Sequence, residues 1–84
     1  MTPDEVLRRY PCEALRFLRG GLGESQLAFA AHIGAATETV ADWETGRAAP
    51  SPPYHRRIVR LLALQLATPE GAAFVASLER GEEA

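Results

Sequence analysis

Cysteine and histidine, on which most protein metal centres and many catalytic sites depend, are nearly absent from this 84-residue chain. Cys12 is the only cysteine, which excludes an internal disulfide and fits a reducing compartment. His32 and His55 stand far apart, whereas a metal site needs three or four ligands at short spacings. No local pattern is typical of nucleophilic catalysis. We therefore expect no enzyme, metal or cofactor, with His32 facing solvent, His55 in the first turn of a helix beside Arg56, and Cys12 as inert packing.

Long apolar runs are missing as well. No stretch reaches the roughly 20 residues that a membrane-spanning helix needs. The N-terminal segment MTPDEVLRRY carries acids and lacks the apolar core of a signal peptide. The sequence therefore predicts a cytoplasmic protein with no membrane partner.

Lysine is absent too, and the nine arginines are outnumbered by eleven acidic residues, for a net charge of −2. Such a balance is unfavourable for a nucleic-acid-binding protein, because affinity for DNA depends on cations that neutralise phosphates. The charges are unevenly distributed, however. Arg56, Arg57 and Arg60 lie in a stretch, residues 45–69, that contains no acid, while acids gather near the C-terminus. Charge alone therefore does not exclude a DNA-binding face.

Strand-like alternation of apolar and polar residues appears nowhere over a useful length, and no segment repeats. Apolar residues recur instead at helical spacing, which predicts an all-α fold of five to six short helices. We expect one domain over residues 1–84, with a core at about 14–66, a central motif at 25–46 and a helical extension at 67–80.

The N-terminal part should form two helices. Thr2 and Glu5 have the spacing of a capping box, which predicts a helix to about residue 10. The next helix is expected over residues 12–19. Gly20 and Gly21 should end it, and a mobile loop should follow.

The central motif, residues 25–46, consists of two short helical patterns joined at a glycine. Ser25 is a suitable N-cap for the first helix. Gly34 stands where a helix needs a left-handed residue to end, and Gly46 ends the second pattern. This arrangement is typical of a helix-turn-helix. The residues expected to face inward are Phe29, Ala30, Ile33, Val40 and Trp43.

The motif resembles the Cro/C1-type (XRE-like) helix-turn-helix regulators, with the family's spacing over about residues 14–66. The resemblance implies a lambda-repressor-like domain that binds double-stranded DNA. The Pro-rich segment at 50–53, the basic and apolar helix after it and the segment at 68–70 resemble the family's antitoxin subgroup, which implies a toxin protein as a possible partner. The matching residues are Leu18-Arg19, Ser25-Gln26, Phe29-Ala30, Ile33-Gly34, Thr39-Val40, Trp43-Glu44, Gly46 and Pro50.

The resemblance also implies roles for individual residues. The second helix of the motif would enter the major groove, so its outward residues would contact bases. Residues around the start of the first helix and the end of the second would contact phosphates. Arg19 and Glu44 occupy the positions of an ion pair that fixes the orientation of the helices. The implied base-reading residues are Thr37, Glu38, Ala41 and Asp42, and the implied phosphate contacts are Ser25, Gln26, Thr39, Thr45 and Arg47.

Three features depart from the family's pattern. Ala36 stands where a capping serine or threonine is common, so the second helix is weakly capped unless Thr37 caps it, and Glu24 replaces a usual apolar residue. Glu38 and Asp42 put two acids on the predicted reading face. A carboxylate can accept a hydrogen bond from cytosine N4, but it also repels phosphates.

These departures leave alternatives open. The leading prediction is a sequence-specific DNA-binding regulator, such as a repressor or an antitoxin-type autoregulator. The alternatives are a protein-interaction module of the same fold with weak or no specific DNA binding, and a small non-catalytic subunit of a larger complex.

The C-terminal half is predicted to form a homodimer. The second half of a helix over residues 53–66 is apolar nearly all round, which in so small a domain implies burial from two sides. A last helix should begin after Thr68 and add to this surface. The residues expected in the dimer interface are Val59, Ala63, Leu64, Leu66, Phe74, Val75 and Leu78.

Overall fold

The structure, a computed structural model, describes residues 1–81, and every regular element within them is an α-helix. The last three residues of the predicted domain, 82–84, lie outside the described part. The all-α prediction with five to six helices is confirmed. The helices are α1 (Pro3–Arg9), α2 (Pro11–Leu22), α3 (Gln26–Ile33), α4 (Thr37–Thr45), α5 (Pro52–Leu66) and α6 (Pro69–Glu79).

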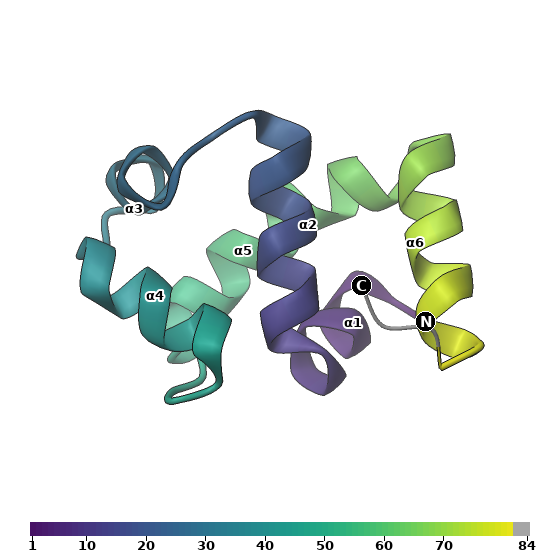
Figure 1. The fold of residues 1–84 in the computed structure, drawn as a ribbon, viewed down its shortest axis with the longest axis horizontal. Helices are drawn as coiled ribbons and strands as arrows, with labels where there is room; N and C mark the ends of the chain where they lie inside the picture. The colour runs from purple at the N-terminus through teal and green to yellow at the C-terminus, as the bar shows by residue number, and fades with distance from the viewer. Residues whose placement is uncertain (82–84) are drawn as a thin grey trace.

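Helix α2 lies between the α3–α4 pair and α6 (Figure 1). It packs against α1, α4 and α5, and α3 packs against α4. Helix α5 passes behind α2 in this view and contacts α1, α2, α3 and α6. The two helices of the predicted motif therefore stand at one end of the molecule, supported by α2 and α5.

The ends of the helices follow the predicted caps. The Thr2 hydroxyl accepts a hydrogen bond from the Glu5 amide at 3.1 Å, and the Glu5 carboxylate accepts one from the Thr2 amide at 3.0 Å. Ser25 caps α3 by accepting from the Ala28 amide at 3.1 Å. Gly34 ends α3 with a φ of 78°, a conformation that glycine adopts without a Cβ penalty. These local predictions are confirmed.

The core is formed by apolar side chains from all six helices. The five residues predicted to face inward from the motif are all buried, with exposed fractions between 0 and 4 %. Trp43 and Phe29 are the largest fully buried side chains, and the Trp43 ring lies 5.4 Å from that of Tyr54. The other core residues are Val6, Leu7, Ala14, Leu15, Leu18, Ile58, Leu62 and Leu78.

The predicted end of the second helix is wrong. Helix α2 continues through Gly20 and Gly21 to Leu22, so the expected loop from residue 20 is largely helical. Glycine weakens a helix but does not end it unless a left-handed residue follows. That residue is Gly23, with a φ of 67°, whose amide reaches the carbonyls of Arg19 and Gly20.

No single helix among residues 1–81 is long and apolar enough to cross a membrane, and α5 and α6 reach that standard only when taken together across a bend of 107°.

Candidate nucleic-acid interface

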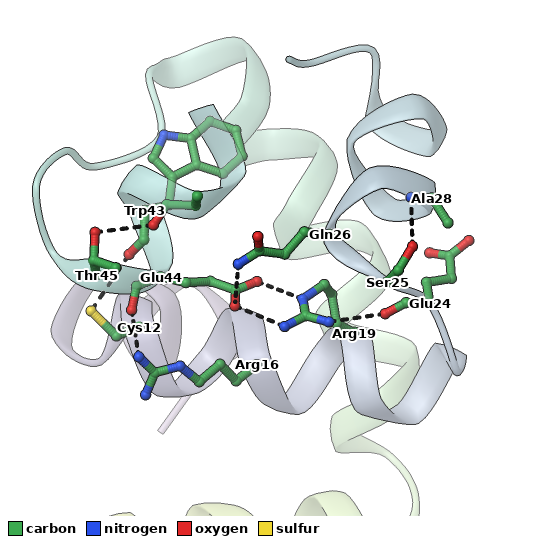
Figure 2. A network of polar contacts seen from close by, with 11 residues as sticks. Cys12, Arg16, Arg19, Glu24, Ser25, Gln26, Ala28, Trp43, Glu44 and Thr45 are labelled. Atoms are coloured by element: carbon green, nitrogen blue, oxygen red, sulfur yellow. Dashed lines mark hydrogen bonds and ion pairs between the residues drawn. The ribbon is translucent and has the colours of Figure 1, made fainter. Parts of the chain in front are cut away.

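An ion pair between α2 and α4 lies at the centre of the motif. The Arg19 guanidinium binds the Glu44 carboxylate through two bonds, Nε to Oε2 at 2.6 Å and Nη2 to Oε1 at 2.9 Å (Figure 2). The Glu44 side chain is 4 % exposed and that of Arg19 is 23 % exposed. The predicted pair is therefore present, and its parallel geometry fixes α4 in direction as well as in position.

Three further hydrogen bonds extend this pair into a network (Figure 2). Gln26 donates its amide to Glu44 Oε1 at 3.3 Å, and Arg16 donates to the Glu44 carbonyl at 2.7 Å. Arg19 also donates to the Glu24 carbonyl at 3.0 Å. We call Arg16, Arg19, Gln26 and Glu44 the Glu44 network. It joins α2, the first turn of α3 and the last turn of α4.

The network holds Glu44 in its charged form. Burial alone would raise the pKa of this carboxyl, because a low-dielectric environment disfavours charge. The hydrogen bonds from Arg19 and Gln26, with the charges of Arg19 and Arg16, outweigh burial, so the pKa of Glu44 lies below its ordinary value. The hydrogen bond to Glu44 and the charge of Glu44 raise the pKa of the Arg19 guanidinium, although burial alone would lower it. Both groups are therefore ionised at neutral pH.

The predicted base-reading residues lie on the side of α4 that faces away from Val40 and Trp43. Glu38 is exposed, and Thr37, Ala41 and Asp42 are partly exposed. Ala36 is the N-cap of α4 and makes no side-chain cap, and Thr37 does not replace it. The first turn of α4 therefore leaves backbone amides without a side-chain cap, and such amides can donate to an anion such as a phosphate.

The predicted phosphate contacts differ in how available they are. The Arg47 side chain is 80 % exposed. Its Nη1 lies 4.0 Å from Asp42 Oδ1, which is a long contact for an ion pair. Ser25 uses its oxygen as a cap, which leaves its hydroxyl hydrogen to donate. Gln26 uses one amide hydrogen on Glu44 and keeps another. Thr39 is partly exposed.

The Thr45 hydroxyl is engaged within its own helix. It donates to the carbonyls of Ala41 at 3.0 Å and Asp42 at 3.3 Å. A hydroxyl has one hydrogen, so donating to a phosphate would require this exposed hydroxyl to rotate away from the two carbonyls. Thr45 stays a candidate phosphate contact.

The residues considered for metal or catalytic chemistry have structural partners. His55 bonds to Asp4 at 2.7 Å, joining α5 to α1, and this bond is the main cause that lowers the pKa of Asp4. His32 bonds to Glu24 at 3.1 Å. The Cys12 thiol donates to the Trp43 carbonyl at 3.5 Å. Within residues 1–81, no group of three or more histidine, cysteine or carboxylate side chains is placed to hold a metal ion.

The residues of the predicted dimer interface lie in different surroundings in the structure. Ala63, Leu66 and Val75 line one hollow of about 450 Å³ between α5, α6 and the N-terminus. Phe74 instead stacks on Phe17 of α2, with ring centres 4.3 Å apart, and Val59 packs partly against the core.

Two further members of the predicted interface also lie outside that hollow. Leu78 is 3 % exposed and is part of the chain's own core, so its assignment to the interface is wrong. Leu64 is 72 % exposed but is not among the lining residues. Apolar periodicity alone does not separate a side chain that packs inside the chain from one left for a partner.

Several contacts that hold the motif were not predicted. Arg57 of α5 donates to the Ile33 carbonyl at 3.0 Å, and the Tyr54 hydroxyl donates to the Gly34 carbonyl at 3.2 Å. Both bonds secure the turn between α3 and α4. The only sequence signal for the Arg16 contact is its position three residues before Arg19, on the same side of α2.

Comparison with known proteins adds no family assignment: no protein-family model, no curated protein and no solved structure matches this chain.

Proposed function

We propose that this chain is a cytoplasmic, sequence-specific DNA-binding regulator that uses α3 and α4 as a helix-turn-helix. The observation that carries the proposal is the Glu44 network. Its two-bond ion pair fixes the last turn of α4 to α2, while Gln26 ties in the start of α3. A helix held this rigidly, with its outer face unoccupied within the chain, suits insertion into a groove.

A homodimer is the form in which such a domain would act. Two copies related by a two-fold axis would present two α4 helices about 34–36 Å apart, matching an inverted repeat in adjacent major grooves. The hollow lined by Ala63, Leu66 and Val75 supports an interface at the α5–α6 end. Covering its apolar lining removes that surface from water, which lowers the free energy of the dimer.

Ala63→Asp should convert this dimer to a monomer, because an unpaired carboxylate would be buried at the contact. Sedimentation at micromolar concentration would measure the change in mass. Ala73→Asp, at an exposed position on α6 outside the hollow, is the control and should leave the mass unchanged. A parent protein that sediments as a monomer would contradict the dimer.

The DNA proposal is tested by selecting duplexes from a random pool at fixed salt. The parent should enrich an inverted repeat. If Glu38 accepts from cytosine, Glu38→Gln should relax the preference at one position of each half-site by about 1–3 kcal/mol while non-specific binding rises. Arg47→Ala is the matched control: it should weaken binding to all duplexes and lower the salt slope by about one per subunit. A folded dimer that enriches no motif would end this proposal.

A second candidate function is favoured by one observation. The outer face of α4 carries Glu38 and Asp42. The neighbouring Arg47 lies with its Nη1 4.0 Å from Asp42 Oδ1. An acidic face of this kind suits a basic protein partner, such as a toxin or a larger complex, better than a field of phosphates. A folded parent protein that enriches no motif in the selection experiment would favour this protein-interaction function.

A further inference from the structure

One face of α5 combines basic and apolar residues and lies outside both the α4 face proposed for DNA binding and the hollow proposed for dimerisation. Arg57, Arg60, Leu61 and Leu64 follow one another at spacings of three, one and three residues. Successive residues are about 100° apart around a helix, so these four lie on one side. We call them the α5 stripe. Leu64, at its C-terminal end, is 72 % exposed.

The stripe borders a small hollow at the end of α3. His32 and Ile33 line it together with Arg57, Arg60 and Leu61, and its volume is about 200 Å³. That space is enough for one apolar side chain of another molecule. The hollow therefore offers an anchor point next to two guanidinium groups.

One of these guanidinium groups is already held in place. Arg57 donates through Nη1 to the Ile33 carbonyl at 3.0 Å, and its guanidinium lies over the Tyr54 ring at 5.5 Å. Its remaining N–H groups are left for another acceptor. Because this side chain is already ordered, less conformational entropy is lost when a partner binds to it.

The charge of the stripe is unbalanced. Helix α5 contains no acidic residue, and neither does the sequence from 46 to 69. The carboxylate of Glu24 bonds to His32 at 3.1 Å and pairs with neither arginine of the stripe. Within residues 1–81, no hydrogen bond or ion pair engages the guanidinium of Arg60. The stripe thus presents two cations beside the exposed Leu64 and the partly buried Leu61.

We propose that the α5 stripe binds an acidic amphipathic helix of another protein. An apolar side chain of that helix fills the hollow, and flanking carboxylates pair with Arg57 and Arg60. Helices recognised in this way present apolar anchors at i, i+3, i+4 and i+7, the same spacing that the stripe itself has. The proposal does not depend on whether α4 binds DNA.

Two other occupants fit the stripe less well. Nucleic acid would use the arginines, but Leu61 and Leu64 offer nothing to phosphates. A second copy on a two-fold axis would set the stripe against itself, bringing like charges together, which is repulsive. An acidic helix satisfies both the cations and the leucines.

The test uses a fluorescent peptide of about 18 residues, with leucines at i, i+3, i+4 and i+7 and glutamates on the flanks. Fluorescence anisotropy against the full chain should show saturable binding. Arg60→Glu should weaken it at least tenfold, because a like charge then faces the glutamates. Leu64→Glu should do the same. Both positions are exposed, so both variants should fold, which circular dichroism checks.

Three controls separate the possible occupants. Arg47→Glu reverses an exposed charge that lies outside the stripe and should leave peptide affinity unchanged, whereas a loss equal to that of Arg60→Glu would mean general charge attraction and overturn the proposal. A peptide with lysines in place of the glutamates should not bind. DNA affinity of Arg60→Glu should match that of the parent, because a large loss would assign the stripe to nucleic acid.

The remaining outcomes also decide the matter. Sedimentation of Leu64→Glu should give the mass of the parent, and conversion of a dimer to a monomer would make the stripe a contact between copies instead. Absence of saturable peptide binding up to millimolar concentration, or amide shifts in NMR spectra that map away from α3 and α5, would overturn the proposal.

Discussion

Trp43→Ala should leave the protein largely unfolded. Trp43 is 2 % exposed, and its ring packs against Tyr54 at the point where α4 meets the core. Truncating a buried tryptophan costs about 3–5 kcal/mol, through lost burial and the cavity left behind. An 84-residue chain has a total stability of only about 4–13 kcal/mol, at roughly 0.05–0.15 kcal/mol per residue. The loss is therefore a large share of the total, and it equals the whole at the lower end of that range.

Urea unfolding followed by far-ultraviolet circular dichroism measures this effect without using the tryptophan signal. Trp43→Phe is the matched control, because it keeps most of the apolar contact and should remain folded with a smaller loss. A Trp43→Ala protein with a cooperative transition close to that of the parent would contradict the central place of this side chain in the core.

Arg19→Ala should be nearly as damaging, although it removes only one ion pair. The Glu44 carboxylate would remain buried without its main partner, and breaking a buried pair in this way costs about 3–5 kcal/mol. Arg8→Ala is the matched control. It breaks the exposed Arg8–Asp4 pair at 2.8 Å and should cost less than about 1 kcal/mol. The double variant Arg19→Met with Glu44→Leu should recover much of the loss, because no unpaired charge is then buried.

The same pair predicts a dependence on pH. The pKa of Glu44 is lower in the folded chain than its ordinary value of 4.5. Its stabilising contribution is therefore fully present above about 4.5 and is lost as pH falls through the lower, folded pKa. Glu44→Gln should flatten this part of the profile, while the exposed Asp4 and Glu5, whose pKa values are also lowered, still contribute. Equal acid sensitivity in parent and Glu44→Gln would show that the carboxylate is not held as described.

Local chemistry explains what could be read from the residues alone. Ser25, Gly34 and Gly46 act on their own backbone neighbours, so the ends of α3 and α4 follow from sequence. The inward positions of Val40 and Trp43 follow from helical spacing. The Arg19–Glu44 pair followed from a family resemblance, since the two residues are far apart in the chain.

Other features depended on tertiary contacts, which local patterns do not contain. Gly20 and Gly21 remain helical, and Gly21 lies so close to Gln65 of α5 that an added Cβ would meet the Gln65 side chain. Leu78 and Leu64 have the same apolar character, yet one is buried in the core and the other is 72 % exposed, since packing of α6 and α5 assigns each its side.

The sequence by itself therefore determined the all-α class, the ends of α3 and α4 and the buried face of the motif, because each depends on interactions within one or two helical turns. Only the tertiary structure decided which outer faces are left for partners. Arg57, for instance, reaches the Ile33 carbonyl from α5 and helps to form the α5 stripe. The physical reason is that an exposed surface is what remains after helices distant in sequence have packed, and that remainder depends on all of them at once.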